Sequence, residues 1–592
     1  MPEASTPGSS TAMDNVASPV AHVHLDNSRV PKMPQPTPAP RHSHSIYRHA
    51  RFNLAQLLEL SKGLRNRPCV CDESQVPMFG AFSWAIILKF DDDVEWIFRS
   101  PRTDHVEISR DTSCRVLASE AATLRYLRQH TSIPVPDVHD FCTTFQSGIG
   151  VPYILMSKAP GIPLSTFRWQ TACHNRARPS GPKDSGRALT QNERSKIMEQ
   201  LGRLMAQLSL LRFPTIGSLF EQDAGEYVIE ECLSPGYVLH GRDELDGIER
   251  GPFSEDREHF SSLVSAFRSQ AEDLPMGYHI LLAPTPAPQE YRSFAEFYTA
   301  QMLWNDYAAV GDKTESSSNR LAYCIAASYL QEQVVPYLGV SRSNQGGFPL
   351  YHHDLSTQNI FVDEHFNITC IIDWAFASTV PHAQLYATPG LPHPRDLVTD
   401  QRLVDAFRST FTDNGESPST MAPGGAPEAS HWNVGEAVSR FMLLVRFDAL
   451  QDYPLLEELH TIIQAHTTSE KKSLQGSLVE ISTKPEILDL AEALKSEDEP
   501  ESDVKRHESQ YFNAVGQDRF VLAQKITELS QHEPFFVLKR DVWAGLISRC
   551  SDTKSLAIAD AKRSMSMLQP GTVSVLIDAL GRQGLDIRLN RT

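Results

Sequence analysis

The sequence YHHDLSTQNIFVDEHFNITCIIDW, from Tyr351 to Trp374, decides the fold of this chain. Two apolar, β-prone runs, residues 360–362 and 368–372, flank a polar segment of five residues. This pattern predicts an antiparallel hairpin with a short loop. Pairing the two strands would bring Asn359, which enters the first strand, alongside Asp373, which leaves the second.

The polar side chains of this stretch suit phosphoryl transfer. Amide and carboxylate oxygens, here from Asn359 and Asp373, suit Mg²⁺, which keeps several waters and bridges substrate phosphates. Asp354, a few residues upstream, could accept the proton of an attacking hydroxyl group. His352 completes the H-x-D-x4-N spacing of kinase catalytic loops, and we expect it to brace the loop rather than react. Alternatively, any one of these residues alone could serve turn geometry and local hydrogen bonds.

The whole stretch resembles the aminoglycoside phosphotransferase family, whose members are relatives of the protein kinases, and in particular its fungal members. Trp374 follows Asp373 where a protein kinase would have Phe-Gly. The resemblance covers about Phe52 to His466. It implies an α+β, bilobal, protein-kinase-like fold with a small, mainly antiparallel β lobe and a large, mainly helical lobe. The motifs are specific for the reaction and not for the acceptor, so the word "aminoglycoside" names no substrate here.

Upstream of this stretch, alternating apolar residues predict the strands of the small lobe. FGAFSWAIILKF and VEWIFRSP alternate in this way, and Asp91–Asp93 between them reads as a hairpin turn. A kinase-like small lobe needs a cation on its third strand and a glutamate on the next helix to hold it. We expect Arg99 and Glu120 in these roles, with Lys89 as a rival cation. The alternative is a surface arginine and a solvated glutamate.

The arginine is a departure from the usual lysine. The fungal members that the chain resembles often carry arginine at this strand position, so the resemblance tolerates it. A forked guanidinium is nevertheless not a simple replacement for the point charge of an ammonium group. Whether turnover is retained with Arg99 is therefore left open by the sequence.

Two further segments are candidates for contact with the nucleotide. Gly80 could let the backbone approach the phosphates, although a glycine that merely permits a turn would look the same. The apolar run VPYILMSKAPGIPL ends in a Pro160-Gly161 break. In the architecture that the resemblance implies, this strand leads to an interlobe hinge whose backbone would meet an adenine. A buried strand that leaves a sheet would look the same. The hinge candidates are Met156, Ser157, Lys158 and Ala159.

The composition of the chain excludes several classes of function. Hydrophobic residues make up 41% and charged residues 22%, as in a soluble globular protein. The net charge of −18 argues against general binding to nucleic acid or to an anionic membrane. No run approaches the ~18 apolar residues of a membrane span. Nine scattered cysteines fit a reducing compartment, so we favour the cytosol. Arginines between Arg29 and Arg51 leave a mitochondrial presequence as a less favoured alternative.

Changes in composition along the chain predict its parts. A Pro-, Ser- and Thr-rich beginning predicts a disordered tail. A polar insertion at 170–186 and a loop at 413–429 interrupt the large lobe. An acidic linker and amphipathic helices form a C-terminal extension, for which packing is the default explanation. The expected parts are the tail, the small lobe, the large lobe with its catalytic loop, and the extension: 1–45, 52–160, 161–466 with 352–359, and 467–592.

These features together predict a phosphotransferase. It would use Mg²⁺ and move the γ-phosphate of ATP, or of another nucleoside triphosphate, to a hydroxyl group of a small molecule. Protein substrates are not expected, because the chain lacks the DFG and APE signatures that bound the activation segment of protein kinases. The rival is a nucleotide-binding regulatory or scaffold protein without turnover, which Arg99 and the long tails would allow. The sequence leaves open the acceptor, ATP versus GTP, and the oligomeric state.

Overall fold

The computed structural model describes most of the chain. The described residues are 45–102, 108–169, 187–222, 225–287, 290–291, 293–339, 347–411, 429–466, 472–530 and 535–550. The expected disordered tail lies outside them apart from Ser45, as does the loop at 413–429 apart from Ala429. The polar insertion at 170–186 and the last predicted helical segments, beyond residue 550, also lie outside the described residues.

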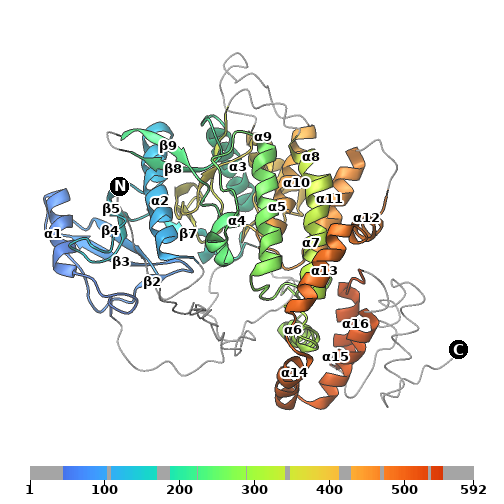
Figure 1. The fold of residues 1–592 in the computed structure, drawn as a ribbon. Coiled ribbons are helices and arrows are strands. Elements are labelled where there is room, and N and C mark those ends of the chain that lie inside the picture. The colour runs from blue at the N-terminus through green and yellow to red at the C-terminus, as the bar shows by residue number, and fades with distance from the viewer. Residues whose placement is uncertain are drawn as a thin grey trace, which may run out of the picture. The chain divides into compact units, whose positions relative to one another are not determined.

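The first part of the described chain forms a six-stranded antiparallel sheet (Figure 1). Its strands are β1 (Cys69–Val70), β2 (Met78–Phe79), β3 (Ser83–Phe90), β4 (Glu95–Pro101), β5 (Val138–Cys142) and β6 (Tyr153–Ser157). The order is β1-β3-β4-β6-β5, and β2 pairs with the beginning of β3. The β3–β4 pairing continues to Lys89↔Glu95, so the predicted hairpin turn at Asp91–Asp93 is confirmed.

Alternation along the strands gives the sheet two apolar faces. Trp84 and Ile86 of β3 lie in a core that also contains Leu57 of helix α1 (Leu54–Arg65). Ile154 and Met156 of β6 lie in a different core, which contains apolar residues of helix α2 (Arg110–His130). Successive side chains of a strand point to opposite faces. Helix α1 therefore packs on one face of the sheet, and α2 packs on the other. We call this part, residues 45–157, the β lobe.

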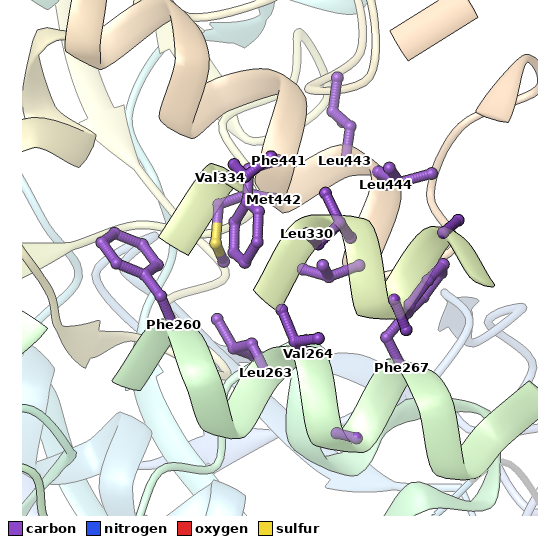
Figure 2. Close-up of a cluster of buried hydrophobic side chains, with 14 of the residues drawn as sticks. Phe260, Leu263, Val264, Phe267, Leu330, Val334, Phe441, Met442, Leu443 and Leu444 are labelled. Atoms are coloured by element: carbon purple, nitrogen blue, oxygen red, sulfur yellow. The ribbon is translucent and has the colours of Figure 1, made fainter. Parts of the chain in front are cut away.

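The next part is mainly helical. Its helices are α3 (Gln191–Leu208), α4 (Pro235–Val238), α5 (Asp256–Asp273), α6 (Phe294–Ala309), α7 (Ser317–Tyr329), α8 (Val335–Leu338), α9 (Gln401–Phe411), α10 (Ala429–Val445) and α11 (Asp452–His466). Short helical turns are η1 (Leu164–Thr166), η3 (Leu239–Glu244), η5 (Leu330–Val334) and η7 (His382–Tyr386). Figure 2 shows how α5, η5 and α10 pack: Phe260, Val264 and Phe267 of α5 face Leu330 of η5 and Phe441 of α10. We call residues 162–466 the helical lobe.

Three small sheets join the helices of this lobe. They are β7 (Ile162–Pro163) with β11 (Ile360–Val362) and β12 (Ile368–Ile371), β8 (Ser218–Glu221) with β9 (Tyr227–Glu230), and β10 (Leu350–Tyr351) with β13 (Ser378–Thr379). Strands β11 and β12 are antiparallel, with Ile360 opposite Ile371 and Val362 opposite Ile368. The hairpin that the sequence predicts at the centre of the chain is therefore confirmed.

The C-terminal helices pack against the helical lobe. They are α12 (Leu474–Ser482), α13 (Pro485–Glu497), α14 (Glu501–Val515), α15 (Gln517–Ser530) and α16 (Arg540–Cys550). Trp304 of α6, Ile526 of α15 and Trp543 of α16 share one buried core. The predicted fold class is thus confirmed: a mainly antiparallel β lobe, a larger helical lobe and a helical C-terminal part. Among the described helices, none is both long enough and apolar enough for a membrane span.

Candidate active site

The loop between β10 and β11 is organised by His352. Its Nδ1 accepts a hydrogen bond from the backbone N–H of Asp354 at 3.1 Å, and its Nε2 lies 3.0 Å from the carbonyl oxygen of Ile372. This arrangement requires a neutral ring with the proton on Nε2. Burial lowers the pKa of His352, which agrees with a neutral ring. Both ring nitrogens are therefore engaged in holding the loop against the end of β12.

Asp354 and Asn359 contact each other across this loop. Nδ2 of Asn359 donates to Oδ2 of Asp354 at 3.0 Å and to its backbone carbonyl at 2.9 Å. Both bonds use the amide nitrogen of Asn359. Its amide oxygen, which could ligate a cation, takes part in neither bond. Burial and the nearby charge of Asp373 raise the pKa of Asp354 to about 6.

Asp373 lies at the end of the returning strand, as the hairpin requires. The backbone N–H of Ile372 donates to the carbonyl of Asn359 at 3.0 Å, which fixes Asn359 and Asp373 side by side. Asp373 has a φ of 63°, in the left-handed region that aspartate tolerates better than most residues. Its side chain is 40% exposed, whereas Asn359 is buried. A partly open carboxylate beside an amide oxygen is a donor set that suits a hard divalent cation.

The predicted ion pair between Arg99 and Glu120 is present. Nη2 of Arg99, on β4, donates to Oε2 of Glu120 on α2, and its Nη1 donates to Oδ1 of Asp373 at 3.1 Å. Burial raises the pKa of Glu120 to about 7, against the opposing effect of Arg99. Burial also disfavours the charge on Arg99, but the two carboxylates outweigh it and raise its pKa. Lys89, the rival cation, pairs with Asp93 at 2.7 Å and is half-exposed.

Gly80 lies in the exposed turn between β2 and β3. Its N–H donates to the carbonyl of Ser83 at 2.8 Å. A Cβ atom at this position would meet only that carbonyl oxygen, at 4.0 Å, and the backbone does not adopt the left-handed region. The turn itself therefore does not require glycine. Phe82, in the same turn, contacts Phe376 with ring centroids 5.2 Å apart, so the turn lies close to the segment that follows Asp373.

The hinge candidates lie where the chain passes between two sheets. The backbone N–H of Lys158 donates to the carbonyl of Glu95 at 3.2 Å, at the edge of the six-stranded sheet. Beyond Gly161 the chain enters β7, which pairs with β11 of the β11–β12 hairpin. The sequence leads us to expect an interlobe hinge at this crossing. The candidates at or just before it are Met156, Ser157, Lys158 and Ala159.

Charged residues from another part of the chain, which no sequence motif indicates, act on Asp354. Arg446 and Asp448 follow α10, and Nη2 of Arg446 lies 3.4 Å from Oδ2 of Asp448. Burial and the charge of Asp373 have the largest effects on the pKa of Asp354. Among the smaller effects, Arg446 lowers this pKa and Asp448 raises it. Arg446 and Asp448 also act on His393, whose pKa is lowered mainly by burial. These residues are far from the catalytic loop in sequence and form no motif, so only the fold reveals them.

Comparisons with known proteins show what this chain is similar to. Residues 89–384, half of the chain, match the model of the phosphotransferase enzyme family. Subtelomeric hrmA-associated cluster proteins from two strains of Aspergillus fumigatus are each 25% identical over 298 residues. Each match covers 47% of this chain and 53% of the relative, so the chain spans about half the length of the curated relatives it matches.

Two solved structures illustrate the structural similarity. The macrolide 2′-phosphotransferase MphH from Brachybacterium faecium is 14% identical, with a TM-score of 0.31, over 71% of this chain and 99% of that chain. A thermostable aminoglycoside phosphotransferase APH(4)-Ia, in ternary complex with AMP-PNP and hygromycin B, is 12% identical. Its TM-score is 0.32, over 70% of this chain and 99% of that chain.

Proposed function

Because this chain belongs to the phosphotransferase enzyme family, we propose that it moves the γ-phosphate of ATP, or of another nucleoside triphosphate, to a hydroxyl group of a small molecule. The observation that carries the proposal is the convergence of Asp354, Asn359 and Asp373, with Arg99 reaching Asp373 from the other lobe. The residues matched by the family include all four of these. Gly80 precedes the matched residues, and its role rests on its place in the turn alone.

Asp354 would act as the base that accepts the proton of the acceptor hydroxyl. A pKa of about 6 leaves it mostly ionised at neutral pH and makes it a stronger base than an ordinary aspartate. Its bond to Asn359 would aim the carboxylate. His352 would hold the loop and take no part in proton transfer, because both of its ring nitrogens are engaged.

Asn359 and Asp373 would hold Mg²⁺. The donor set fits this ion: one partly exposed carboxylate and one amide oxygen that the loop's hydrogen bonds leave unused. When bound, Mg²⁺ offsets charge on the phosphate oxygens. Arg99, oriented by Glu120, would contact the phosphates. The nucleotide would also meet the Gly80 turn and the backbone from Met156 to Ala159.

A nucleotide-binding regulatory protein without turnover is the second candidate. The observation in its favour is the bond from Arg99 to Asp373, because it engages the carboxylate that the metal would need. Against it stands the complete set of Asp354, Asn359 and Asp373. The two candidates differ in turnover and not in nucleotide binding.

The remaining expectations stay proposals. They are a small-molecule acceptor, no nucleic-acid or membrane partner, a cytosolic location, and the part boundaries at about residues 45, 160 and 466. The net charge of −18 supports the absence of a nucleic-acid or anionic-membrane partner. An acidic surface disfavours the binding of polyanions, but it does not indicate which ligand a single pocket binds.

A radiolabel screen tests the proposed function. The full-length chain, Mg²⁺ and γ-labelled ATP are incubated with a library of hydroxyl-bearing metabolites, with Asp354→Asn as the matched variant. We expect a labelled phosphomonoester with at least one acceptor. The variant should lose roughly 10²- to 10⁴-fold of this transfer, the usual contribution of a positioned base. A wild-type chain that binds nucleotide and labels no acceptor would favour the regulatory protein instead.

A further inference from the structure

The helix that carries Glu120 is held from two opposite sides. At about 100° per residue, positions 115 and 125 of α2 share one face, and position 120 projects from the opposite face. Glu120 faces Arg99 on the β lobe. Arg115 and Arg125 face hairpin β8–β9, which belongs to the helical lobe and lies beside α2 (Figure 1).

Ion pairs join α2 to this hairpin. Nη1 of Arg125 lies 2.8 Å from Oε2 of Glu221, and these side chains are 29% and 19% exposed. Nη2 of Arg115 lies 3.3 Å from Oε2 of Glu230, and its Nη1 pairs with Glu231. The Arg125–Glu221 pair is the more buried, so water screens it less than it screens the Arg115 pairs. The Arg125 guanidinium also lies over the Phe141 ring of β5, 4.9 Å from its centroid.

Further contacts fix both ends of the helix. At its beginning, the backbone N–H of Ser109, the N-cap residue, donates to Oδ2 of Asp243 in η3 at 2.7 Å. Near its end, Tyr126 packs edge-on against Tyr227 of β9 with ring centroids 5.1 Å apart. The hydroxyl of Tyr227 donates to Oε1 of Gln129 at 3.3 Å. The whole length of α2 is therefore bonded to the helical lobe.

The hairpin is itself anchored close to the metal-binding segment. The backbone N–H of Gly217, just before β8, donates to Oγ1 of Thr379 at 2.8 Å, and the N–H of Thr379 donates back to the Gly217 carbonyl at 2.8 Å. A Cβ atom on Gly217 would lie 2.0 Å from the carbonyl oxygen of Glu230, so this close approach requires glycine. Thr379 is in β13, on the segment that leaves Asp373. A continuous chain of contacts thus runs from Glu120 through α2 and the hairpin to the strand after Asp373.

We propose that Arg115 and Arg125 of α2, with Glu221 and Glu230 of hairpin β8–β9, are positioning residues that hold Glu120 against Arg99. The inference rests on the proposed function, since it assigns these residues to the nucleotide phosphate site. The contacts are all internal to the chain, so the Arg99–Glu120 pair needs neither an activating partner nor a modification to form. We call these four residues the clamp. They act through Glu120 and touch no substrate.

Binding of Mg²⁺ and AMP-PNP, measured by calorimetry, tests the clamp without any acceptor. Glu221→Gln keeps the shape of the side chain and removes its charge. We expect it to raise the Kd roughly three- to tenfold, with a small change in Tm. The charge swap Arg125→Glu with Glu221→Arg should restore a Kd within about twofold of wild type. A merely structural pair would lower Tm and leave Kd unchanged.

Arg128→Met is the matched control. Arg128 is on the same helix, but it pairs with Asp137 of the β lobe at 2.7 Å and is 56% exposed. This variant should leave Kd unchanged. An unchanged Kd in Glu221→Gln, an equal loss in the control, or a swap that fails to restore binding would overturn the clamp alone. A wild-type chain that bound no nucleotide would overturn the clamp and the proposed function together.

Discussion

At the scale of single residues, Asp373 and Asp354 have different surroundings. The Asp373 carboxylate is partly exposed and faces Arg99, whereas the Asp354 carboxylate accepts a hydrogen bond from Asn359. Asp373 should therefore be the main carboxylate contact to Mg²⁺, with Asn359 as the weaker ligand. We predict that Asp373→Ala abolishes Mg²⁺-dependent nucleotide binding, because the loss of its carboxylate removes the charge that holds the cation.

Calorimetric titration of ATP with and without Mg²⁺ checks this assignment. Asp354→Ala serves as the matched variant and should keep most of the Mg²⁺-dependent binding. If both variants bind alike, or if Asp354→Ala is the one that loses the metal dependence, the roles of the two carboxylates must be exchanged or dropped.

The raised pKa of Asp354 gives a pH prediction. Asp354 can accept a proton only as a carboxylate, so kcat/KM should fall as the pH drops through about 6. The ratio kcat/KM reports the free enzyme, the state to which this pKa belongs. Arg446 lowers the pKa of Asp354, so Arg446→Met should move the acidic limb to higher pH. A limb near pH 4 in wild type, or a shift to lower pH in the variant, would contradict this environment for Asp354.

Which site residues the sequence could predict depends on how they are spaced along it. His352, Asp354 and Asn359 share one loop, and Asp373 is tied to them by one hairpin, so their proximity follows from local pairing. The role of Arg99 could be predicted only from the family resemblance, because its partner Glu120 is on another element. Arg446 had no such signal, since only the packing of α10 brings it to Asp354.

At the scale of elements, Lys313 links the end of α6 to a C-terminal helix. Its Nζ donates to the carbonyls of Tyr307 and Val310 at 2.7 and 2.6 Å, and to Oγ1 of Thr527 on α15 at 2.7 Å. The N–H groups of Lys313 satisfy carbonyls at a helix C-terminus that lack a helical partner, and burial lowers the pKa of this lysine to about 7. We predict that Lys313→Met, which keeps the apolar stem, lowers the free energy of unfolding by about 2 kcal/mol. Denaturant titration measures this loss.

Lys505→Met is the control for this prediction. Lys505 makes an exposed pair with Glu501 within one helix, and such pairs contribute little to stability. Equal stability of the two variants would mean that Lys313 does not fasten α15 to the helical lobe.

Elements were predictable where one sequence period dominates. The alternation of apolar residues predicted β3 and β4, and the turn residues predicted the β11–β12 hairpin. The amphipathic C-terminal helices were expected to pack, but their partner was not identifiable. Trp304 and Trp543 share one core only because α6 and α16 are brought together from distant parts of the chain. A periodicity defines which face of an element is buried and not what covers it.

At the scale of the whole molecule, buried histidines predict acid sensitivity. His259 is 1% exposed, and burial lowers its pKa to about 3 from an ordinary value near 6.5. Between these values the unfolded chain binds the proton and the folded chain does not, so stability falls as the pH drops below about 6.5. One such group contributes up to about 1.4 kcal/mol per pH unit.

The acid prediction is checked by Tm measured from pH 7 to pH 4. His259→Gln should show a shallower loss of stability than wild type over this range. His365→Gln should show the wild-type slope, because the His365 side chain is 74% exposed. Identical slopes in all three proteins would show that folding does not lower the pKa of His259.

The central claim is turnover that depends on Asp354, and ³¹P NMR measures it without knowledge of the acceptor. ATP and Mg²⁺ are incubated with the wild-type chain or with Asp354→Asn, and the γ-phosphate signal is followed. Because water is the only acceptor supplied, we predict slow hydrolysis to ADP and inorganic phosphate in the wild type, and a loss of roughly 10²-fold or more in the variant. ATP that stays intact with the wild type despite measurable binding, or equal rates in the two proteins, would contradict the account.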